Sequence, residues 1–370
     1  MDSLALHKKA LVVDLHSDTV LRMKERFDFG RRDTAGSMDI PRLREGGIDL
    51  QVFACWIPAK TPRENCRVRA DEMIDSLENQ VKLHNNDIAV CRSATEAREI
   101  ISSGRIAAFI GIENGVAIAG DLANLDHFYA RGVRYMTLIH TSSSEWCISS
   151  ADTTPKFEGL TDFGLDVVRR MNKLGMIIDV SHASVKVVEE VLKITTSPII
   201  ASHSCVYALC AHDRNLTDEQ IKAIAKNGGV IGINFFGGYL SERWAAVVDP
   251  ITDANRARID SINAIVKGDF VKEREAFAWL FAEFDKALEK EDINVATVVD
   301  HIDYIVKLVG PDYIGLGSDF DGVYSLPNGL KDCSMMPNIT KELVKRGYSE
   351  TDIEQILGGN FMRVFQAVCG

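Results

Sequence analysis

The stretch GLTDFGLDVVRRMNKLGMIIDVSHAS, residues 159–184, shows most clearly how this chain folds. Gly164–Leu174 has the spacing of an amphipathic helix, and Met176–Val180 is a short apolar run that ends at polar residues. A second amphipathic helix is predicted directly afterwards, over Val185–Leu192. Helices on either side of a buried apolar strand are typical of a parallel sheet that is covered on both faces.

Apolar runs of the same kind recur along the chain and alternate with segments of helical spacing, such as Glu64–Asn85 and Asp218–Lys226. The eight predicted strands are Leu11–Leu15, Leu50–Ile57, Ile106–Ile112, Val133–Ile139, Met176–Val180, Pro198–Ala201, Val230–Phe235 and Tyr313–Leu316. Eight strand–helix units favour an α/β fold of the closed (β/α)8 type, the TIM barrel, over an open doubly wound sheet. His-Ser-Asp at 16–18 follows the first strand, where a nucleotide-binding Rossmann unit would carry a Gly-rich phosphate loop.

The length of the chain, 370 residues, suits one such barrel, so we expect a single domain over residues 1–370. Residues 237–299 lie between the last two predicted strands and are too many for a plain connection. This segment is rich in Ala, Glu, Lys and aromatic residues, which predicts a helical insertion within the barrel before its last strand.

The composition excludes several classes of protein. Lys and Arg number 42 against 53 Asp and Glu, and this net charge of −11 disfavours non-specific binding to nucleic acid or to anionic membranes. The eight cysteines are scattered without a Cys-x-x-Cys pair, so we expect buried free thiols. The sequence has no apolar run of membrane-spanning length, no signal-peptide layout and no lipid-anchor tail. We therefore expect a cytoplasmic protein without a membrane anchor, although a trimmed sequence would hide a removed signal.

Polar residues that can do chemistry stand at or just after the ends of the predicted strands. They are His16, Asp18, Glu113, His140, Asp179, His182, His203, Asp319 and Asp321. The carboxyl ends of the strands of a barrel converge on one face, and enzymes with this fold carry their active sites there. The pattern therefore predicts one site that is rich in imidazole and carboxylate groups.

Each of these residues also has a structural interpretation. His16 and Asp18 point the same way on a strand and can reach one ion, or they can cap a turn. Glu113 lies among apolar residues, so it requires either a metal ion or a salt bridge to an arginine. His182 and His203 each end an apolar strand, as a zinc ligand or a hydrogen-bonded core histidine would.

The five residues divide naturally into two metal sites that share Glu113. One ion would bind His16, Asp18 and Glu113, and the other would bind Glu113, His182 and His203. Nitrogen and carboxylate ligands without thiolates favour zinc, with manganese and cobalt as alternatives. Two neighbouring ions can ionise a bridging water and polarise a carbonyl group together. Asp179 either orients a ligand histidine or caps the following turn.

Several segments together resemble a known family. The segments are VVDLHSDT at 12–19, IGIENG at 110–115, VRYMTLIH at 133–140, the opening stretch at 159–184, SPIIASHS at 197–204, HDRNLTD at 212–218 and GLGSDFDGV at 315–323. The chain resembles the membrane (renal-type) dipeptidases, peptidase family M19, as a bacterial-type member within the amidohydrolase-like superfamily. The resemblance extends from about residue 11 to the end of the chain.

The resemblance implies a zinc-dependent dipeptidase that acts on dipeptides with a free C-terminal carboxylate, in the L,L and also the L,D series. It implies two zinc ions, bridged by Glu113 and a hydroxide, with His16, Asp18, His182 and His203 as the other ligands. His140 would stabilise the tetrahedral intermediate, Arg214 would bind the substrate carboxylate, and Asp319 would act as the acid/base. The family also suggests a homodimer.

Three other interpretations of the sequence stay open. A related dinuclear amidohydrolase could act on another amide or a lactone, and a binding protein could keep the barrel without catalysis. Arg214 alone could form a surface salt bridge, and Asp321 is better explained as a turn or supporting residue than as a catalyst. Segments 141–158 and 237–299 differ from the family pattern; we expect both to border the pocket, so the preferred side chains of the substrate do not follow from the resemblance.

Overall fold

The structure is a computed structural model that describes residues 2–23, 27–33, 35–266 and 270–370. The strands in these residues are β1 (Val13–Asp14), β2 (Leu50–Trp56), β3 (Ile88–Cys91), β4 (Ile106–Glu113), β5 (Val133–Thr137), β6 (Ile177–Asp179), β7 (Ile200–Ala201), β8 (Val230–Ile233) and β9 (Ile314–Leu316). They pair in parallel in the order β2-β1-β9-β8-β7-β6-β5-β4-β3. An additional pairing of β2 with β4 closes eight of them into a barrel, and β3 stays outside it.

Each of the eight predicted strands overlaps an observed strand, so the (β/α)8 prediction is confirmed. The sequence analysis missed β3, a four-residue strand that pairs with the first half of β4, from Ile106 to Phe109. The pairing of β5 with β4 starts only at Ile110, which leaves this first half of β4 available to β3. A run of four apolar residues outside the barrel is too short to be separated from a loop by its pattern.

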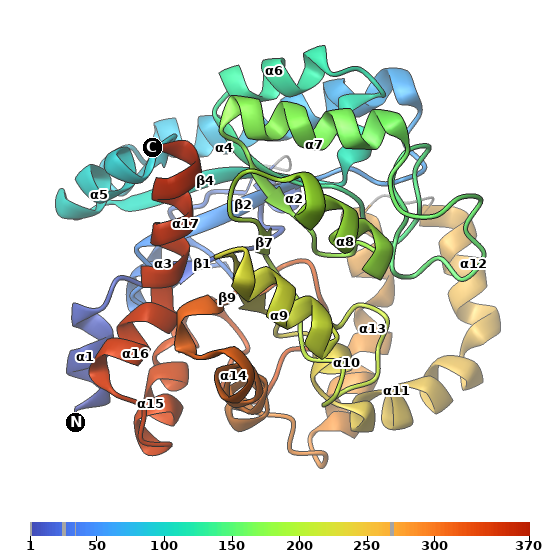
Figure 1. The fold of residues 1–370 in the computed structure, drawn as a ribbon. Helices are drawn as coiled ribbons and strands as arrows, with labels where there is room; N and C mark the ends of the chain where they lie inside the picture. Colours follow the sequence, from blue (N-terminus) through green and yellow to red (C-terminus); the bar gives the residue numbers. More distant parts are fainter. Residues whose placement is uncertain (1, 24–26, 34, 267–269) are drawn as a thin grey trace.

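Helices surround the strands on the outside (Figure 1). Outside the segment between β8 and β9 they are α1 (Ser3–Lys9), α2 (Val20–Met23), α3 (Ile40–Glu45), α4 (Arg63–Leu83), α5 (Ala94–Ser102), α6 (Ala123–Ala130), α7 (Asp162–Leu174), α8 (Val185–Ile194), α9 (Asp218–Lys226), α15 (Pro337–Lys345), α16 (Glu350–Glu354) and α17 (Asn360–Cys369). The four predicted helices correspond to α4, α7, α8 and α9. Judged over the described residues, no helix has the length and apolar character that crossing a bilayer requires.

Local signals at both ends fix α7 and thereby place β6. The Thr161 side chain accepts a hydrogen bond from the backbone N–H of Gly164 and caps the start of the helix. Gly175 ends it in the left-handed conformation with φ of 74°, which glycine adopts without steric cost. β6 begins two residues later and ends at Asp179, so the polar residues of the opening stretch come to the carboxyl end of the barrel.

Apolar side chains fill the opposite, amino-terminal end of the barrel. Phe361 and Phe365 of α17 pack against Phe109 of β4, with ring centroids 5.7 and 4.9 Å apart. Ile177 and Val230 belong to the same buried cluster. Because this end is closed by hydrocarbon, the carboxyl end is the one that can open to substrate. All eight cysteines are free thiols, as expected, and seven of them are buried.

The segment between β8 and β9 is helical. It contains α10 (Gly237–Leu240), α11 (Glu242–Ala254), α12 (Arg256–Val266), α13 (Phe270–Leu288) and α14 (Val295–Val309). Figure 1 shows α11, α12 and α13 together on one side of the molecule, away from α1, α5 and α17. α11 and α13 share a separate apolar cluster around Trp244, Leu280 and Phe284, whereas α14 begins inside the range 237–299 and packs against the barrel core.

Candidate metal centre

The residues predicted from the strand ends come together at the carboxyl end of the barrel. Glu113 is the last residue of β4, while His16, His182 and His203 follow β1, β6 and β7. Asp319 follows β9. None of the five is more than 9% exposed, so they form one buried polar group.

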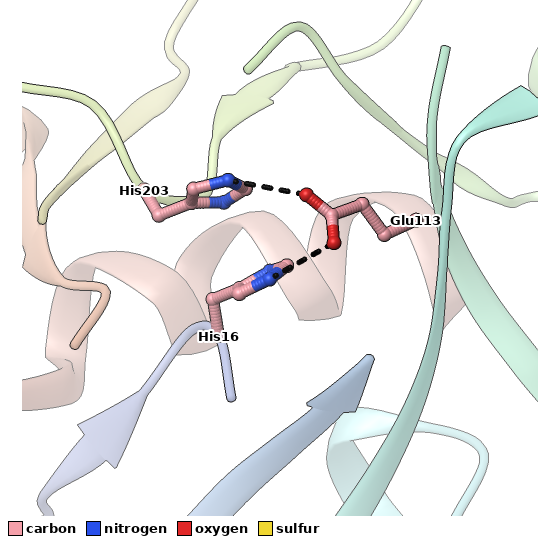
Figure 2. Close-up of side chains that lie close together, drawn as sticks. All are labelled: His16, Glu113 and His203. Atoms are coloured by element: carbon pink, nitrogen blue, oxygen red, sulfur yellow. Dashed lines mark ion pairs between the residues drawn. The ribbon is translucent and has the colours of Figure 1, made fainter. Parts of the chain in front are cut away.

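The two carboxylate oxygens of Glu113 face different partners. Oε2 lies 3.6 Å from His16 Nε2, while Oε1 lies 3.1 Å from His182 Nε2 and 3.4 Å from His203 Nε2. Figure 2 shows His16 and His203 one above the other on the same side of Glu113, each directed at a different carboxylate oxygen. Asp18 Oδ2 lies 3.6 Å from His16 Nε2. We call these the His16 side and the His182 side of Glu113.

The donor atoms fit divalent metal ions. His16 Nε2 is buried and lacks a hydrogen-bond partner among the described atoms, and His182 Nε2 and His203 Nε2 face each other at 2.9 Å. A metal cation can accept a lone pair from each of these nitrogens. In a hydrogen bond between two ring nitrogens, one nitrogen must carry a proton and only the other uses its lone pair. Among the described residues, three sets have ligand atoms within 4.8 Å of one another: His16, Glu113 and His203; Glu113, His140 and His182; and His16, Asp18 and Asp319.

Hydroxyl groups fix the histidine tautomers. The Ser202 hydroxyl donates to Asp179 Oδ2 at 2.6 Å, so its oxygen accepts the proton of His203 Nδ1 at 2.7 Å. That leaves the lone pair of His203 Nε2 directed at Glu113. His16 Nδ1 lies 2.9 Å from the Tyr135 hydroxyl, which suits the same arrangement. Partners of this kind orient metal-binding histidines.

The electrostatics of the two sides differ. Burial raises the pKa of Asp18 to about 8, and the negative charge of Glu113 acts in the same direction. Burial also acts to raise the pKa of Glu113, but the nearby His140 and His16 outweigh it and hold this pKa well below its usual value. Burial holds the pKa of His182 well below its usual value, which favours the neutral ring that a metal ion requires.

His140 and Arg214 both lie beside the donor set. His140 Nε2 is 3.8 Å from Glu113 Oε1, and its ring packs edge-on against Trp56 with centroids 5.5 Å apart. Arg214 is 4% exposed and donates from Nη2 to the backbone oxygen of His203 at 2.9 Å. Its Nε is buried and has no hydrogen-bond partner among the described atoms.

Within the described residues, cavities border the donor set on the His182 side and beside His140. One of about 490 Å³ is lined by His182 and Arg214, together with residues of the 141–158 segment. The other, of about 910 Å³, is lined by His140 and by Glu273 of α13. The expectation that both divergent segments border the pocket is therefore confirmed. A larger cavity of about 1080 Å³ is lined mainly by residues 141–157, with none of the metal-donor residues in its wall.

Comparison with known proteins gives the family. The family model described as "Membrane dipeptidase (Peptidase family M19)" matches residues 2–369. The chain belongs to peptidase family M19. This agrees with the resemblance seen in the sequence and with the predicted enzyme class, a metallo-dipeptidase.

Individual relatives support the family and the fold. Dipeptidase 3 of Mus musculus is 31% identical over 376 residues; the match covers 99% of this chain and 66% of the mouse protein, about two thirds of its length. The structure of the probable dipeptidase PvdM from Pseudomonas aeruginosa has 30% identity and a TM-score of 0.82, and the match covers 99% of this chain and 97% of that one. A metallopeptidase from Rhodobacter sphaeroides, solved with a phosphinate mimic of L-Ala-D-Ala, has 23% identity and a TM-score of 0.79. The match covers 97% of this chain and 99% of that one, and it shows the shared fold.

This M19 member keeps unusual backbone conformations at its site. His182, Asp319 and Asp321 have φ of 66°, 63° and 66°, in the left-handed region that residues other than glycine rarely adopt. Such conformations persist where the surrounding structure enforces them, often at functional sites. A Cβ on Gly322 would lie 2.1 Å from Asp18 Oδ2 and 2.3 Å from Asp319 Oδ1, so only glycine leaves room for both carboxylates.

Supporting residues were missed by the sequence analysis. Tyr135 and Ser202 contact the imidazoles, and the side-chain amide of Asn234 donates to Asp319 Oδ2 at 2.9 Å. A polar residue directly after the apolar strand β8 was the available signal for Asn234. The Asp321 side chain accepts hydrogen bonds from the Thr19 hydroxyl and the Ser37 backbone, both at 2.8 Å, consistent with a supporting role.

Proposed function

We propose that this protein hydrolyses dipeptides with a free C-terminal carboxylate, of the L,L and L,D series, with two zinc ions. The proposed ligands are His16, Asp18, Glu113, His182 and His203. The observation that carries the proposal is that the two oxygens of Glu113 face different donors, Oε2 toward His16 and Oε1 toward His182 and His203. When bound, the two ions would supply the Lewis acidity that ionises a water molecule and polarises the scissile carbonyl.

Asp319 is the proposed acid/base. It would take the proton of the attacking water and transfer it to the leaving amine. Its Oδ2 is held by the Asn234 amide at 2.9 Å, which leaves Oδ1 available for this transfer. The absence of a side chain at Gly322 keeps the space next to Oδ1 open.

His140 is the proposed donor to the oxyanion. Burial lowers its pKa, so the ring is neutral near pH 7. The Thr141 hydroxyl lies 3.1 Å from His140 Nδ1; if it donates there, the remaining proton sits on Nε2, which faces the metal donor set. A donor in that place stabilises the charge that develops on the carbonyl oxygen.

Arg214 is the proposed clamp for the substrate carboxylate. Its guanidinium group lines the cavity of about 490 Å³ beside His182, and the hydrogen bond to the backbone of His203 fixes its orientation. A buried guanidinium makes charge-assisted hydrogen bonds with a carboxylate, and this restricts substrates to short peptides with a free C-terminus.

Hydrolysis of a dipeptide library, with each dipeptide paired with its C-terminal amide, tests the function. We expect hydrolysis that is lost with a chelator and restored by zinc. Arg214→Ala should lower kcat/KM on dipeptides by about 10²-fold, since a hydrogen bond to a charged group contributes about 1.5–3 kcal/mol, and should remove the preference for the free acid over the amide. Cleavage of a lactone or another amide, with dipeptides untouched, would instead favour a related amidohydrolase.

The proposal includes three statements that rest on the sequence and the family resemblance. They are a single catalytic domain with an inserted helical segment, a homodimer, and a cytoplasmic location. Limited proteolysis, sedimentation of the purified protein and fractionation of cells that express it test these statements separately.

A further inference from the structure

Two fully buried aspartates lie one layer beneath the candidate metal centre. Asp14 is the last residue of β1, and Asp179 is the last residue of β6. Both side chains are 0% exposed. A buried carboxylate costs free energy unless several donors satisfy it, so its partners indicate what it holds in place.

The two carboxylates have matching partners. Asp14 accepts hydrogen bonds from the backbone N–H of Ser318 at 2.8 Å and from the Ser318 hydroxyl at 2.6 Å. Asp179 accepts from the backbone N–H of Ser202 at 2.9 Å and from the Ser202 hydroxyl at 2.6 Å. In each case the serine follows the neighbouring strand, which is β9 beside β1 and β7 beside β6. We call each pair a carboxylate–serine clasp.

Each clasp joins two segments that carry functional side chains. Asp14 precedes His16 by two residues, and Ser318 directly precedes Asp319. The clasp of Asp179 has the same arrangement, with His182 three residues after the aspartate and His203 directly after Ser202. We propose that Asp14 and Asp179 are positioning residues for the proposed site: Asp179 acts on the metal ligand His203, and Asp14 acts on the acid/base Asp319.

The two clasps differ in what their serine contacts next. The Ser202 oxygen accepts the proton of His203 Nδ1, so the Asp179 clasp determines the tautomer of a metal ligand. The Ser318 hydroxyl instead lies 3.2 Å from the backbone oxygen of His16, to which the backbone N–H of Asp319 donates at 3.1 Å. The Asp14 clasp therefore holds the backbone that carries the acid/base.

Substitution by asparagine distinguishes these roles. In Asp179→Asn the new amide can donate to the Ser202 oxygen, and the Ser202 hydroxyl then donates to His203 Nδ1. His203 would carry its remaining proton on Nε2 and lose its lone pair for the metal. In Asp14→Asn the Ser318 hydroxyl can turn to the backbone oxygen of His16, so the ligand atoms keep their tautomers.

The experiment measures zinc affinity by competition with a chromophoric chelator, and kcat and KM separately. Asp179→Asn should weaken one of the two zinc sites by about 10- to 100-fold, the range for partners that orient metal ligands. Asp14→Asn should retain both wild-type zinc affinities and KM, while kcat falls by up to about 10²-fold because Asp319 is misplaced. Wild-type zinc binding by Asp179→Asn, or equal zinc loss in both variants, would overturn the proposal.

Two controls keep the result interpretable. If Asp179→Asn does not fold, Ser202→Ala replaces it and should also weaken one zinc site; unchanged zinc binding there would overturn the proposal. If the wild-type protein binds two zinc ions but cleaves no dipeptide, the proposed function fails, while the zinc affinities of the variants still test the clasp of Asp179.

Discussion

The two sides of Glu113 present different kinds of donor group. On the His16 side, His16 lies close to the carboxylates of Asp18 and Asp319, whereas the His182 side presents imidazole rings. Burial raises the pKa of Asp18 and lowers the pKa of His182, so on each side it favours the neutral form of the side chain. In the proposed centre the two sites would differ: the imidazole side favours zinc, whereas the side richer in carboxylate would accept manganese as well as zinc.

Loss of the shared carboxylate should have the largest effect. Glu113→Gln removes the one negative charge that both sides use, so neither ion should be retained in stoichiometric amounts. Dipeptide hydrolysis should fall by more than about 10³-fold, because metal ions supply several kcal/mol to such reactions and about 1.4 kcal/mol corresponds to a factor of ten. Elemental analysis and steady-state rates measure both. A variant that keeps two ions would show that Glu113 does not connect the sides.

Matched substitutions on each side should separate the two ions. Asp18→Asn should retain one zinc ion on the His182 side and lose manganese binding, whereas His182→Asn should keep the manganese site. Either change removes a proposed metal ligand. Hydrolysis should therefore fall by at least about 10²-fold, which is the largest effect usual for residues that only orient a ligand. Manganese resonance spectra and zinc analysis of the two proteins check this. Identical metal content in both variants would mean that the sides do not differ.

A smaller effect concerns the loop that carries His203. His301 accepts a hydrogen bond from the Val206 N–H at Nδ1, at 3.0 Å, and contacts the Leu240 oxygen through Nε2, at 3.0 Å, which requires the neutral ring. Burial lowers the pKa of His301 below its usual value of 6.5, so the unfolded chain takes up this proton first as the pH falls. The stability that the neutral His301 ring contributes above about pH 6.5 is therefore lost as the pH falls toward the lower pKa of the folded protein.

Replacing this ring should flatten that dependence. His301→Gln keeps an acceptor and a donor but cannot titrate, so the slope of unfolding free energy against pH below 6.5 should decrease by up to about 1.4 kcal/mol per pH unit. Denaturant unfolding of both proteins at several pH values measures this. Equal slopes would show that the neutral ring of His301 contributes nothing to acid sensitivity.

The sequence predicted the barrel and the residues that gather at its carboxyl end for the same physical reason. Parallel strands buried on both faces are apolar along their length, so the polar residues that interrupt this pattern near strand ends, such as Glu113 and His203, stand out. Short β3 has no such contrast with its surroundings and was missed. Its position depends on where β5 starts to pair with β4, which no local pattern records.

The supporting layer could not be predicted in the same way. Ser202, Ser318 and Tyr135 are ordinary residues by type, and their roles arise only when neighbouring strands bring them to Asp179, Asp14 and His16. The pocket walls depend on how the 141–158 segment and α13 pack over the barrel end, and the sequence indicates only that these segments diverge.

Zinc titration of the metal-free wild-type protein, with dipeptide hydrolysis followed in parallel, tests the central claim most directly. The account predicts saturation at two equivalents of zinc per chain and full activity only when both are bound. Saturation of binding and activity at one equivalent would contradict a dinuclear centre shared through Glu113.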